Sequence, residues 1–145
     1  MIKRGIYLFK NPPSRYSANL NANERESMST LLYKEISYEI QGACFTAWNN
    51  FRNAFKESII ENALVLEMEK RGLWIERQKR IDIYYKEKKV GAYVPDIVIE
   101  DLILFELKRK PYLAKQDIQQ FWYYMKSTEY KVGYLVNFGD KKKNL

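Results

Sequence analysis

The 145-residue chain contains no histidine and a single cysteine, Cys44. Without histidine there is no Ser-His-Asp triad, no Cys-His pair and no zinc site with imidazole ligands. A single cysteine excludes an internal disulfide bond, and the apolar neighbours Ala43 and Phe45 predict that Cys44 is buried. Catalysis by this chain would therefore depend on carboxylates, lysine, tyrosine or a metal ion held by oxygen ligands.

Long apolar runs are also missing from the sequence. No stretch approaches the roughly 18 apolar residues that indicate a membrane-spanning helix. The apolar segment at residues 6–9 is too short for the core of a signal peptide, and no small-residue cleavage site follows it. We therefore expect an intracellular, cytoplasmic protein without a membrane partner.

Positive charge is in excess, with 25 Lys and Arg against 18 Asp and Glu, and 15% of the residues are aromatic. A small basic domain rich in aromatic rings is typical of proteins that bind nucleic acid, although lysine-rich proteins are also basic without doing so. The candidate contacts with phosphate groups are Lys86, Lys88, Lys89, Arg109 and Lys110.

Residues 1–28 are polar and contain a Pro-Pro pair, so they predict a poorly ordered leader with one short strand at residues 5–9. Residues 29–145 predict one domain. Its apolar spacing predicts helices over residues 30–49, 55–71 and 114–128, and Gly72 is expected to end the second helix. Alternating residues predict a strand starting at residue 73, a three-stranded meander over residues 80–109 and a last strand at residues 131–138. This order indicates an α/β domain with a mixed sheet flanked by helices.

The predicted meander carries the residues of chemical interest. Glu106 and Lys108 are two apart on one strand, so they lie on the same face. A three-residue loop at residues 100–102 would place Asp96 opposite Glu106, whereas a two-residue loop would put the two carboxylates on opposite faces. The chemistry therefore requires the longer loop.

A Glu-x-Lys triplet is common on exposed edge strands, where it forms an ion pair without catalytic meaning. The run at residues 102–105 is too apolar for an edge, however, and predicts a central strand. Carboxylates at the end of such a strand need a partner or a metal ion. Mg²⁺, or Mn²⁺ in its place, suits the pair Asp96 and Glu106 because it prefers oxygen ligands, and the Leu107 carbonyl is a further candidate ligand. Lys108 would orient or help to deprotonate the attacking water.

Asp96 followed ten residues later by Glu106-Leu107-Lys108 resembles the signature of PD-(D/E)xK nucleases. The stretch from Leu31 to Gly139 resembles the GxxExxY proteins, a family of small nucleases in that superfamily. The other matching segments are residues 32–35, 57–58, 61–64, 67–72, 76–79, 90–91, Gln120 with Tyr124, and 136–139. Ala54 and Ile60 depart from the family pattern, since they stand where its name has Gly and Tyr.

The resemblance implies a restriction-endonuclease-like fold and hydrolysis of phosphodiester bonds with a divalent metal. It also implies a carboxylate from the helix before the sheet, for which Glu61 is the first candidate and Glu57 the second. Gln120 and Tyr124 resemble a Gln-x-x-x-Tyr element that lies beside the site in exonuclease-like relatives. Packing alone would equally explain Gln120 and Tyr124, and an ordinary solvent-facing helix would explain both glutamates.

The function that fits these observations is a metal-dependent nuclease acting on nucleic acid, with DNA as the expected substrate. A non-catalytic nucleic-acid-binding module on the same fold is the alternative. A third hypothesis is an assembly role, as a homodimer or beside a larger protein partner, through the aromatic residues Tyr84, Tyr85, Trp122 and Tyr123.

Overall fold

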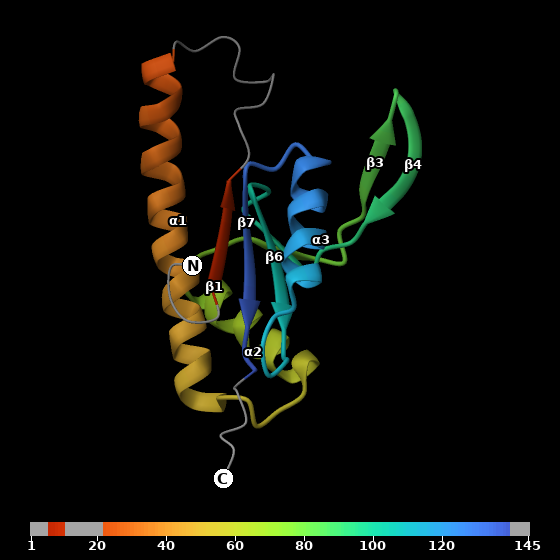
Figure 1. Cartoon of the computed structure of the whole chain (residues 1–145). Helices are drawn as coiled ribbons and strands as arrows, with labels where there is room; N and C mark the ends of the chain where they lie inside the picture. Colours follow the sequence, from red (N-terminus) through yellow and green to blue (C-terminus); the bar gives the residue numbers. More distant parts are fainter. Residues whose placement is uncertain (1–5, 11–21, 140–145) are drawn as a thin grey trace.

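A computed structural model of the chain describes residues 6–10 and 22–139, with side chains from residue 33 onward in the second range (Figure 1). The three helices are α1 (Ala22–Phe51), α2 (Glu57–Lys70) and α3 (Lys115–Lys126). A five-stranded sheet has the order β1-β7-β6-β5-β2, formed by β1 (Ile6–Lys10), β7 (Val132–Asn137), β6 (Ile103–Lys108), β5 (Ile97–Ile99) and β2 (Ile75–Arg77). A separate two-stranded sheet pairs β3 (Ile81–Tyr85) with β4 (Lys88–Tyr93).

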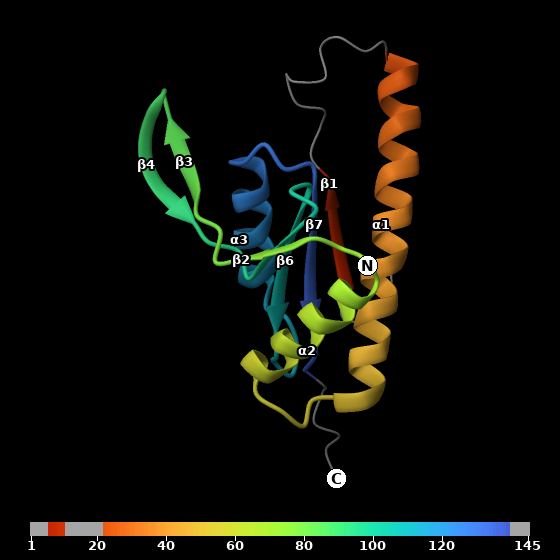
Figure 2. The ribbon, with the colours of Figure 1, turned by 180° about the vertical axis from the view of Figure 1, so that it is seen from behind.

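The five-stranded sheet is mixed, because β6 runs parallel to β7 while the other pairs are antiparallel. Its two faces are both covered. Alternate side chains such as Phe105 and Tyr134 pack with α1 and α2, and the intervening ones, such as Leu104 and Leu135, pack with α3. Figure 2 shows α2 crossing in front of the sheet with α3 on its far side. This arrangement confirms the predicted α/β domain with helices flanking a mixed sheet, and it is consistent with a restriction-endonuclease-like fold.

Helix α1 begins earlier than the sequence analysis predicted. The expected start at residue 30 is wrong, because the helix already includes Ala22 and runs to Phe51. Its C-terminal half buries Ile40, Ala43 and Ala47 against the sheet. Packing of this half anchors the helix, and helix-favouring residues such as Glu24 and Glu26 let it extend toward the N-terminus.

The predicted strand at residues 5–9 is confirmed by β1, which pairs with β7 from Ile6↔Val136 to Lys10↔Val132. The Pro-Pro segment of the predicted leader lies outside the described residues. The division of the chain at residue 28 therefore stays a prediction.

The three-stranded meander predicted over residues 80–109 is wrong in one respect. The middle strand of this meander, expected to run from residue 90 to residue 99, is replaced by two strands, β4 and β5, which belong to different sheets. Pro95 lies in the break between them and has no backbone N–H for a strand ladder. The β3–β4 hairpin is consequently released from the main sheet and projects beside α3 (Figure 1).

Two features of the predicted core are confirmed. Strand β6 is central, paired with β5 on one side and β7 on the other, and Ile103, Leu104 and Phe105 have no exposed surface. Cys44 is buried, and burial raises the pKa of its thiol to about 12.

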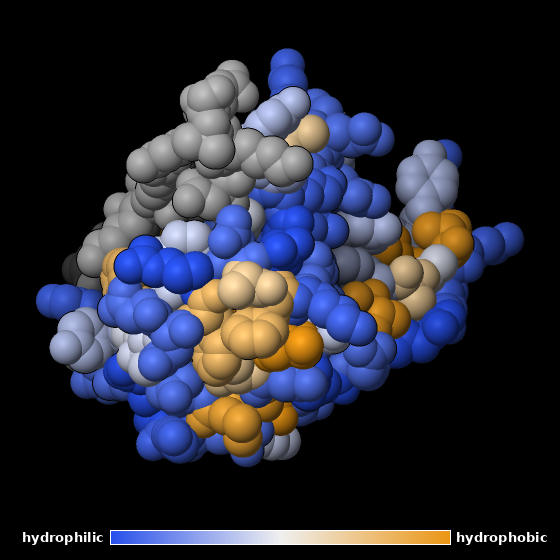
Figure 3. Space-filling model, turned by 90° about the horizontal axis from the view of Figure 1, so that it is seen from below, coloured by the Kyte–Doolittle hydropathy of each residue, from blue (hydrophilic) through white to orange (hydrophobic). Residues whose placement is uncertain are grey.

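The described surface is mainly polar. Seen from below, apolar side chains gather at the centre of the face, and smaller apolar groups lie among the hydrophilic ones around it (Figure 3). The exposed apolar side chains between the end of α1 and the first turn of α2 include Phe55 and Ile59. Among the described helices none is both long and apolar enough to cross a membrane.

Candidate active site

The loop between β5 and β6 fixes the relative position of the two central carboxylates. The register pairs Ile99 with Ile103 and Ile97 with Phe105, which leaves the three-residue loop 100–102 that the sequence analysis required. The next residues outward, Asp96 and Glu106, consequently lie opposite each other on one face of the sheet. Backbone angles φ of +54° at Glu100 and +51° at Asp101 make the tight turn.

Hydrogen bonds hold both carboxylates in place. Asp96 Oδ2 accepts a hydrogen bond of 2.8 Å from the Leu107 backbone N–H. Glu106 Oε1 accepts bonds from the Asp96 backbone N–H at 3.2 Å and from the Tyr93 hydroxyl at 2.7 Å. Within the described part of the chain, the second oxygen of each carboxylate accepts no hydrogen bond, so each keeps an oxygen for a further partner.

The pKa of Glu106 shows how strongly this site disfavours negative charge. Burial, and then the neighbouring charge of Asp96, raise the pKa of Glu106 to about 7. The hydrogen bond from Tyr93 and the charge of Lys108 act in the opposite direction but do not offset burial. Near neutral pH both the protonated and the ionised form of Glu106 are therefore populated.

Asp96 responds to the same surroundings. Its pKa is raised first by burial and then by the negative charge of Glu61, while the Leu107 N–H, Lys108 and Arg77 lower it. A pair of carboxylates whose pKa values are both raised will gain stability from a nearby cation.

Lys108 lies two residues after Glu106 on β6, so its side chain emerges on the same face of the sheet. Its positive charge lowers the pKa values of Asp96, Glu106 and Glu57, which places the ammonium group within electrostatic reach of all three carboxylates. The structure thus brings together the Asp96, Glu106 and Lys108 set singled out from the sequence.

Helix α2 brings two glutamates close to Asp96. Glu61 is half-buried and forms an ion pair with Arg77 of β2, whose guanidinium also donates a 2.8 Å hydrogen bond to Asn62 Oδ1. Glu57 lies one turn earlier, and its pKa is raised by partial burial and by the charge of Asp96. Both glutamates are therefore electrostatic neighbours of Asp96. Glu61 is ion-paired with Arg77, whereas Glu57 is influenced at longer range by the charges of Lys108 and Lys110.

Tyr93 is the residue of this site that the sequence analysis missed. It ends β4, is 7% exposed and donates its hydroxyl hydrogen bond to Glu106. Its ring stacks on Tyr124 of α3, with ring centroids 4.0 Å apart and an angle of 8° between the planes. Burial beside Glu106 raises the pKa of Tyr93, so it stays a hydrogen-bond donor. The apolar and aromatic character of residues 90–94 gave no signal for this role, because it depends on a partner thirteen residues away.

The other predicted residues lie at different distances from the carboxylates. Tyr124 contacts the site through Tyr93. Gln120, one turn earlier on α3, is exposed, and its side chain forms no hydrogen bond with the described residues. Arg109 donates to the Asn53 carbonyl, with Nε at 3.1 Å, and Lys110 Nζ lies 2.7 Å from Asp117 Oδ1. The remaining cations Lys86, Lys88 and Lys89 lie at the tip of the β3–β4 hairpin, outside the carboxylate cluster.

The oxygen donors around Asp96 and Glu106 suit a divalent cation. Within residues 6–10 and 22–139 no three acidic or cysteine side chains converge into a ready-made metal cluster. Asp96 and Glu106 nevertheless supply two facing carboxylates, each with an oxygen that accepts no hydrogen bond, in surroundings that raise both pKa values. Oxygen donors and a deficit of positive charge fit Mg²⁺, which retains several water ligands when protein ligands are few.

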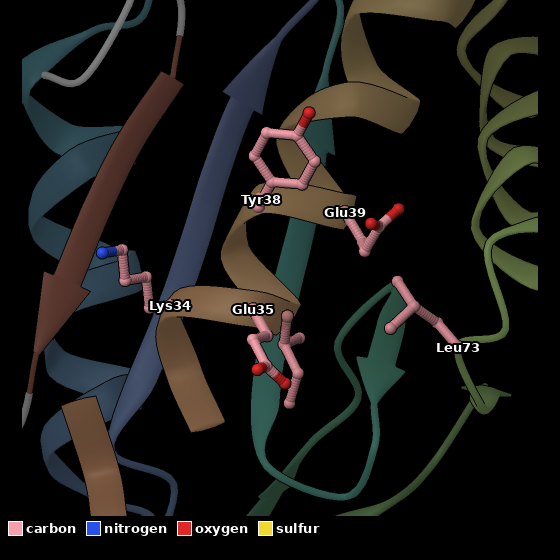
Figure 4. A pocket seen from close by; sticks show the side chains of 6 residues that line it. Lys34, Glu35, Tyr38, Glu39 and Leu73 are labelled. Carbon is pink, nitrogen blue, oxygen red and sulfur yellow. The ribbon is translucent and has the colours of Figure 1, made fainter. Parts of the chain in front are cut away.

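The surface also carries a depression that is separate from these residues. It is lined by Lys34, Glu35, Ile36, Tyr38 and Glu39 of α1 and by Leu73 after α2 (Figure 4). Its lining includes none of the carboxylates near Asp96. Asp96, Glu106 and Lys108 accordingly lie elsewhere, where the inner strand β5 begins and β6 ends, near α2 and α3.

The chain is similar to a known family of proteins. A family model described as the PD-(D/E)XK nuclease superfamily matches residues 34–145, which include α2, α3, both sheets except β1, and most of α1. Neither the comparison with curated proteins nor that with solved structures gave a match.

Proposed function

Because the chain belongs to the PD-(D/E)XK nuclease superfamily, we propose that it is a divalent-metal-dependent nuclease that hydrolyses phosphodiester bonds in DNA. The pairing of Asp96 with Glu106 across the β5–β6 hairpin, with Lys108 on the same face, carries the proposal. Within the superfamily we propose that the chain belongs to the GxxExxY family, because the motif segments around this hairpin occur in the same order as in that family.

Asp96 and Glu106 are the proposed ligands of Mg²⁺ or Mn²⁺, and the Leu107 carbonyl and Glu61 are further oxygen donors. When bound, such an ion lowers the pKa of a water molecule and offsets charge on the scissile phosphate. Glu61 is preferred to Glu57 because it is more buried and forms an ion pair with Arg77. Both glutamates interact with Asp96: the charge of Glu61 raises the pKa of Asp96, and the charge of Asp96 raises the pKa of Glu57.

Lys108 is the proposed group that orients the attacking water and stabilises charge that develops on the phosphate. Its position on the face shared with Glu106 supports this role. Tyr124 is proposed to keep Tyr93, and through it Glu106, in position, which the ring stacking supports. Gln120 is exposed one turn before Tyr124, where it is available to contact the substrate.

The test is cleavage of labelled linear, branched and single-stranded DNA, with RNA counterparts, over a titration of Mg²⁺ and Mn²⁺. Asp96→Asn and Glu106→Gln remove one charge each but keep an acceptor oxygen for the hydrogen bonds described above. We expect each to reduce cleavage by at least about a hundredfold, since loss of even an outer-shell partner costs 10- to 100-fold at metal sites.

Glu69→Gln is the matched control, because Glu69 is an exposed glutamate on the same helix as Glu61. It should cleave like the unaltered protein. Equal activity of Asp96→Asn and the unaltered protein would contradict the proposed site. Nucleic-acid binding without cleavage at any metal concentration would favour the alternative, a binding module that retains the nuclease fold.

A further inference from the structure

The β3–β4 hairpin forms an arm that extends beyond the packed body (Figure 1). Past Ile83 its side chains are exposed on both faces, with Tyr84 61%, Tyr85 63% and Val90 62% exposed. Figure 3 shows this arm at the right of the molecule, with apolar groups among hydrophilic ones. Rings this accessible bury little apolar area and so contribute little to the stability of the fold.

The two faces of the arm differ in where they lead. Ile81 and Ile83 pack against the hydrophobic cluster that includes Tyr93, and Ile81 is paired directly with Tyr93. The register of the hairpin shifts between Ile83 and Tyr84, where Val90 of β4 has no partner. The extra residue is on β4, so side chains still alternate along β3 and Tyr85 lies on the same face as Ile81 and Ile83. The face that carries Tyr85 therefore continues, about 13 Å along β3 at 3.3 Å per residue, to the tyrosine that is hydrogen-bonded to Glu106.

Tyr84 lies on the opposite face. It is paired with Lys89, whose Nζ is 3.1 Å from Asp82 Oδ1, and Asp82 is two residues before Tyr84 on β3. This ion pair confirms the alternation and occupies the lysine of that face. The two adjacent tyrosines are equally exposed but point away from each other.

Positive charge is concentrated around Tyr85. Lys88 is its cross-strand partner, and Lys86 Nζ lies 5.4 Å from the centroid of its ring. Among the described residues neither lysine forms an ion pair, so both ammonium groups are available to an anion. An exposed aromatic ring with ammonium groups beside it suits a nucleotide strand, whose bases stack while its phosphates contact the cations.

We propose that Tyr85, Lys86 and Lys88 form a binding surface for single-stranded nucleic acid, on which a base stacks against the Tyr85 ring and neighbouring phosphates contact the two lysines. The inference extends the proposed nuclease function, because the strand would run from this surface toward Glu106. It implies a preference for substrates with an unpaired segment next to the scissile bond.

A duplex is the less suitable occupant. The faces of bases in a duplex are covered by their neighbours, whereas those of an unpaired segment are free to stack on a protein ring. A two-stranded ribbon can also enter a major groove, where lysine is one of the readers of guanine. A duplex is therefore included in the test as the competing occupant.

The test measures binding of the full-length protein to a fluorescein-labelled 20-nucleotide single strand by fluorescence anisotropy, in EDTA so that no cleavage occurs. Tyr85→Ala should weaken binding about five- to hundredfold, the range observed for loss of one stacked base. Tyr84→Ala is the matched control and should change the dissociation constant less than twofold. Tyr85→Phe keeps the ring and should bind like the unaltered protein.

A second measurement tests the lysines. Lys88→Ala should make the slope of log affinity against log salt concentration less steep by about 0.7, as expected for one lost phosphate contact on a single strand. A blunt duplex of the same sequence should bind more weakly than the single strand and should not distinguish Tyr85→Ala from Tyr84→Ala.

Three results would overturn the proposal: equal effects of the two alanine variants, unchanged binding by Tyr85→Ala, or tighter binding of the duplex with the same loss in Tyr85→Ala. These outcomes are separate from those for the nuclease. If Asp96→Asn abolishes cleavage while Tyr85→Ala binds normally, the nuclease stands and the arm does not. If Tyr85→Ala loses binding but no metal supports cleavage, the arm stands and the nuclease does not.

Discussion

Glu106 combines two demands at the scale of a single residue. It sits at the end of a buried strand, where ionisation is disfavoured, yet it is proposed as a metal ligand, which requires the carboxylate form. The Tyr93 hydroxyl and the Asp96 N–H supply hydrogen bonds to it, but its pKa still rises to about 7. The folded, metal-free protein therefore carries an electrostatic penalty at Glu106 that a bound cation would relieve.

The sign of this penalty leads to a prediction about stability. The pKa of Glu106 rises from 4.5 to about 7 on folding, so between these pH values the folded state binds more protons than the unfolded state. The free energy of unfolding should then decrease as the pH rises through this window. Glu106→Gln should be more stable than the unaltered protein at pH 8 in EDTA, by at most about 3 kcal/mol, and should lose that advantage below pH 4.5.

Urea unfolding at pH 4, 6 and 8 measures this difference. Glu69→Gln, in which the altered group is exposed, should show no comparable change with pH. A Glu106→Gln protein that becomes less stable, relative to the unaltered one, as the pH rises would contradict the prediction.

The β5–β6 hairpin shows the role of an element. Strand β5 has three residues, and its backbone pairing with β6 ends at Ile97↔Phe105. Beyond that point the Asp96 side chain accepts the hydrogen bond of the Leu107 N–H, which continues the ladder by one step. One carboxylate oxygen thus has a structural function, and the other is left for the proposed chemistry.

This division of labour predicts different effects of two neutral substitutions. Asp96→Asn and Asp96→Ala both remove the charge, but only asparagine keeps an acceptor for the Leu107 N–H. Asp96→Ala should therefore be less stable than Asp96→Asn by about 1–3 kcal/mol, the usual consequence of leaving a buried donor unsatisfied. Urea denaturation of both variants at pH 8 in EDTA measures the difference, and equal midpoints would show that the hydrogen bond has no role in folding.

At the scale of the whole molecule, the sheet joins distant parts of the chain. Strand β1 forms one edge by pairing with β7, and Ile6 is buried in the main core. On the other face Phe9 packs edge-on against Phe121 of α3, with ring centroids 5.1 Å apart. Strand β1 thereby pairs with the edge that β7 would otherwise expose, and it contributes side chains to the packing on both faces of the sheet.

Removal of residues 1–28, at the boundary predicted from sequence, should consequently destabilise the protein. The loss should be at least about 1.5–3 kcal/mol, the contribution of one fully buried apolar side chain such as Ile6. An open β7 edge should also promote aggregation. Thermal unfolding and light scattering measure both effects, and a chain lacking only residues 1–5 is the control. A truncated protein as stable as the full chain would instead support the boundary at residue 29.

The parts that were predictable from sequence depend on local patterns. Helical spacing identified α2 and α3, the apolar run identified β6 as the central strand, and the spacing of Asp96 and Glu106 required the three-residue loop that the structure has. These features succeed because side-chain alternation and helical periodicity follow from residues close together in the chain. The charge and aromatic content also indicated a polyanion as partner, and the sequence named Lys86 and Lys88 among the candidate phosphate contacts without showing that they flank Tyr85 on a projecting hairpin.

Only the tertiary structure decided how these pieces meet. The hydroxyl of Tyr93 reaches Glu106, Arg77 reaches Glu61, and β1 reaches β7, and none of these contacts has a local sequence pattern. Pro95 is visible in the sequence, but its effect depends on the partners of the flanking strands. It separates two sheets here because β4 pairs with β3, whereas β5 pairs with β2 and β6. The sequence by itself therefore determined the pair Asp96 and Glu106, while long-range packing determined their buried surroundings, and with them the pKa values and the direction in which the Tyr85 arm points.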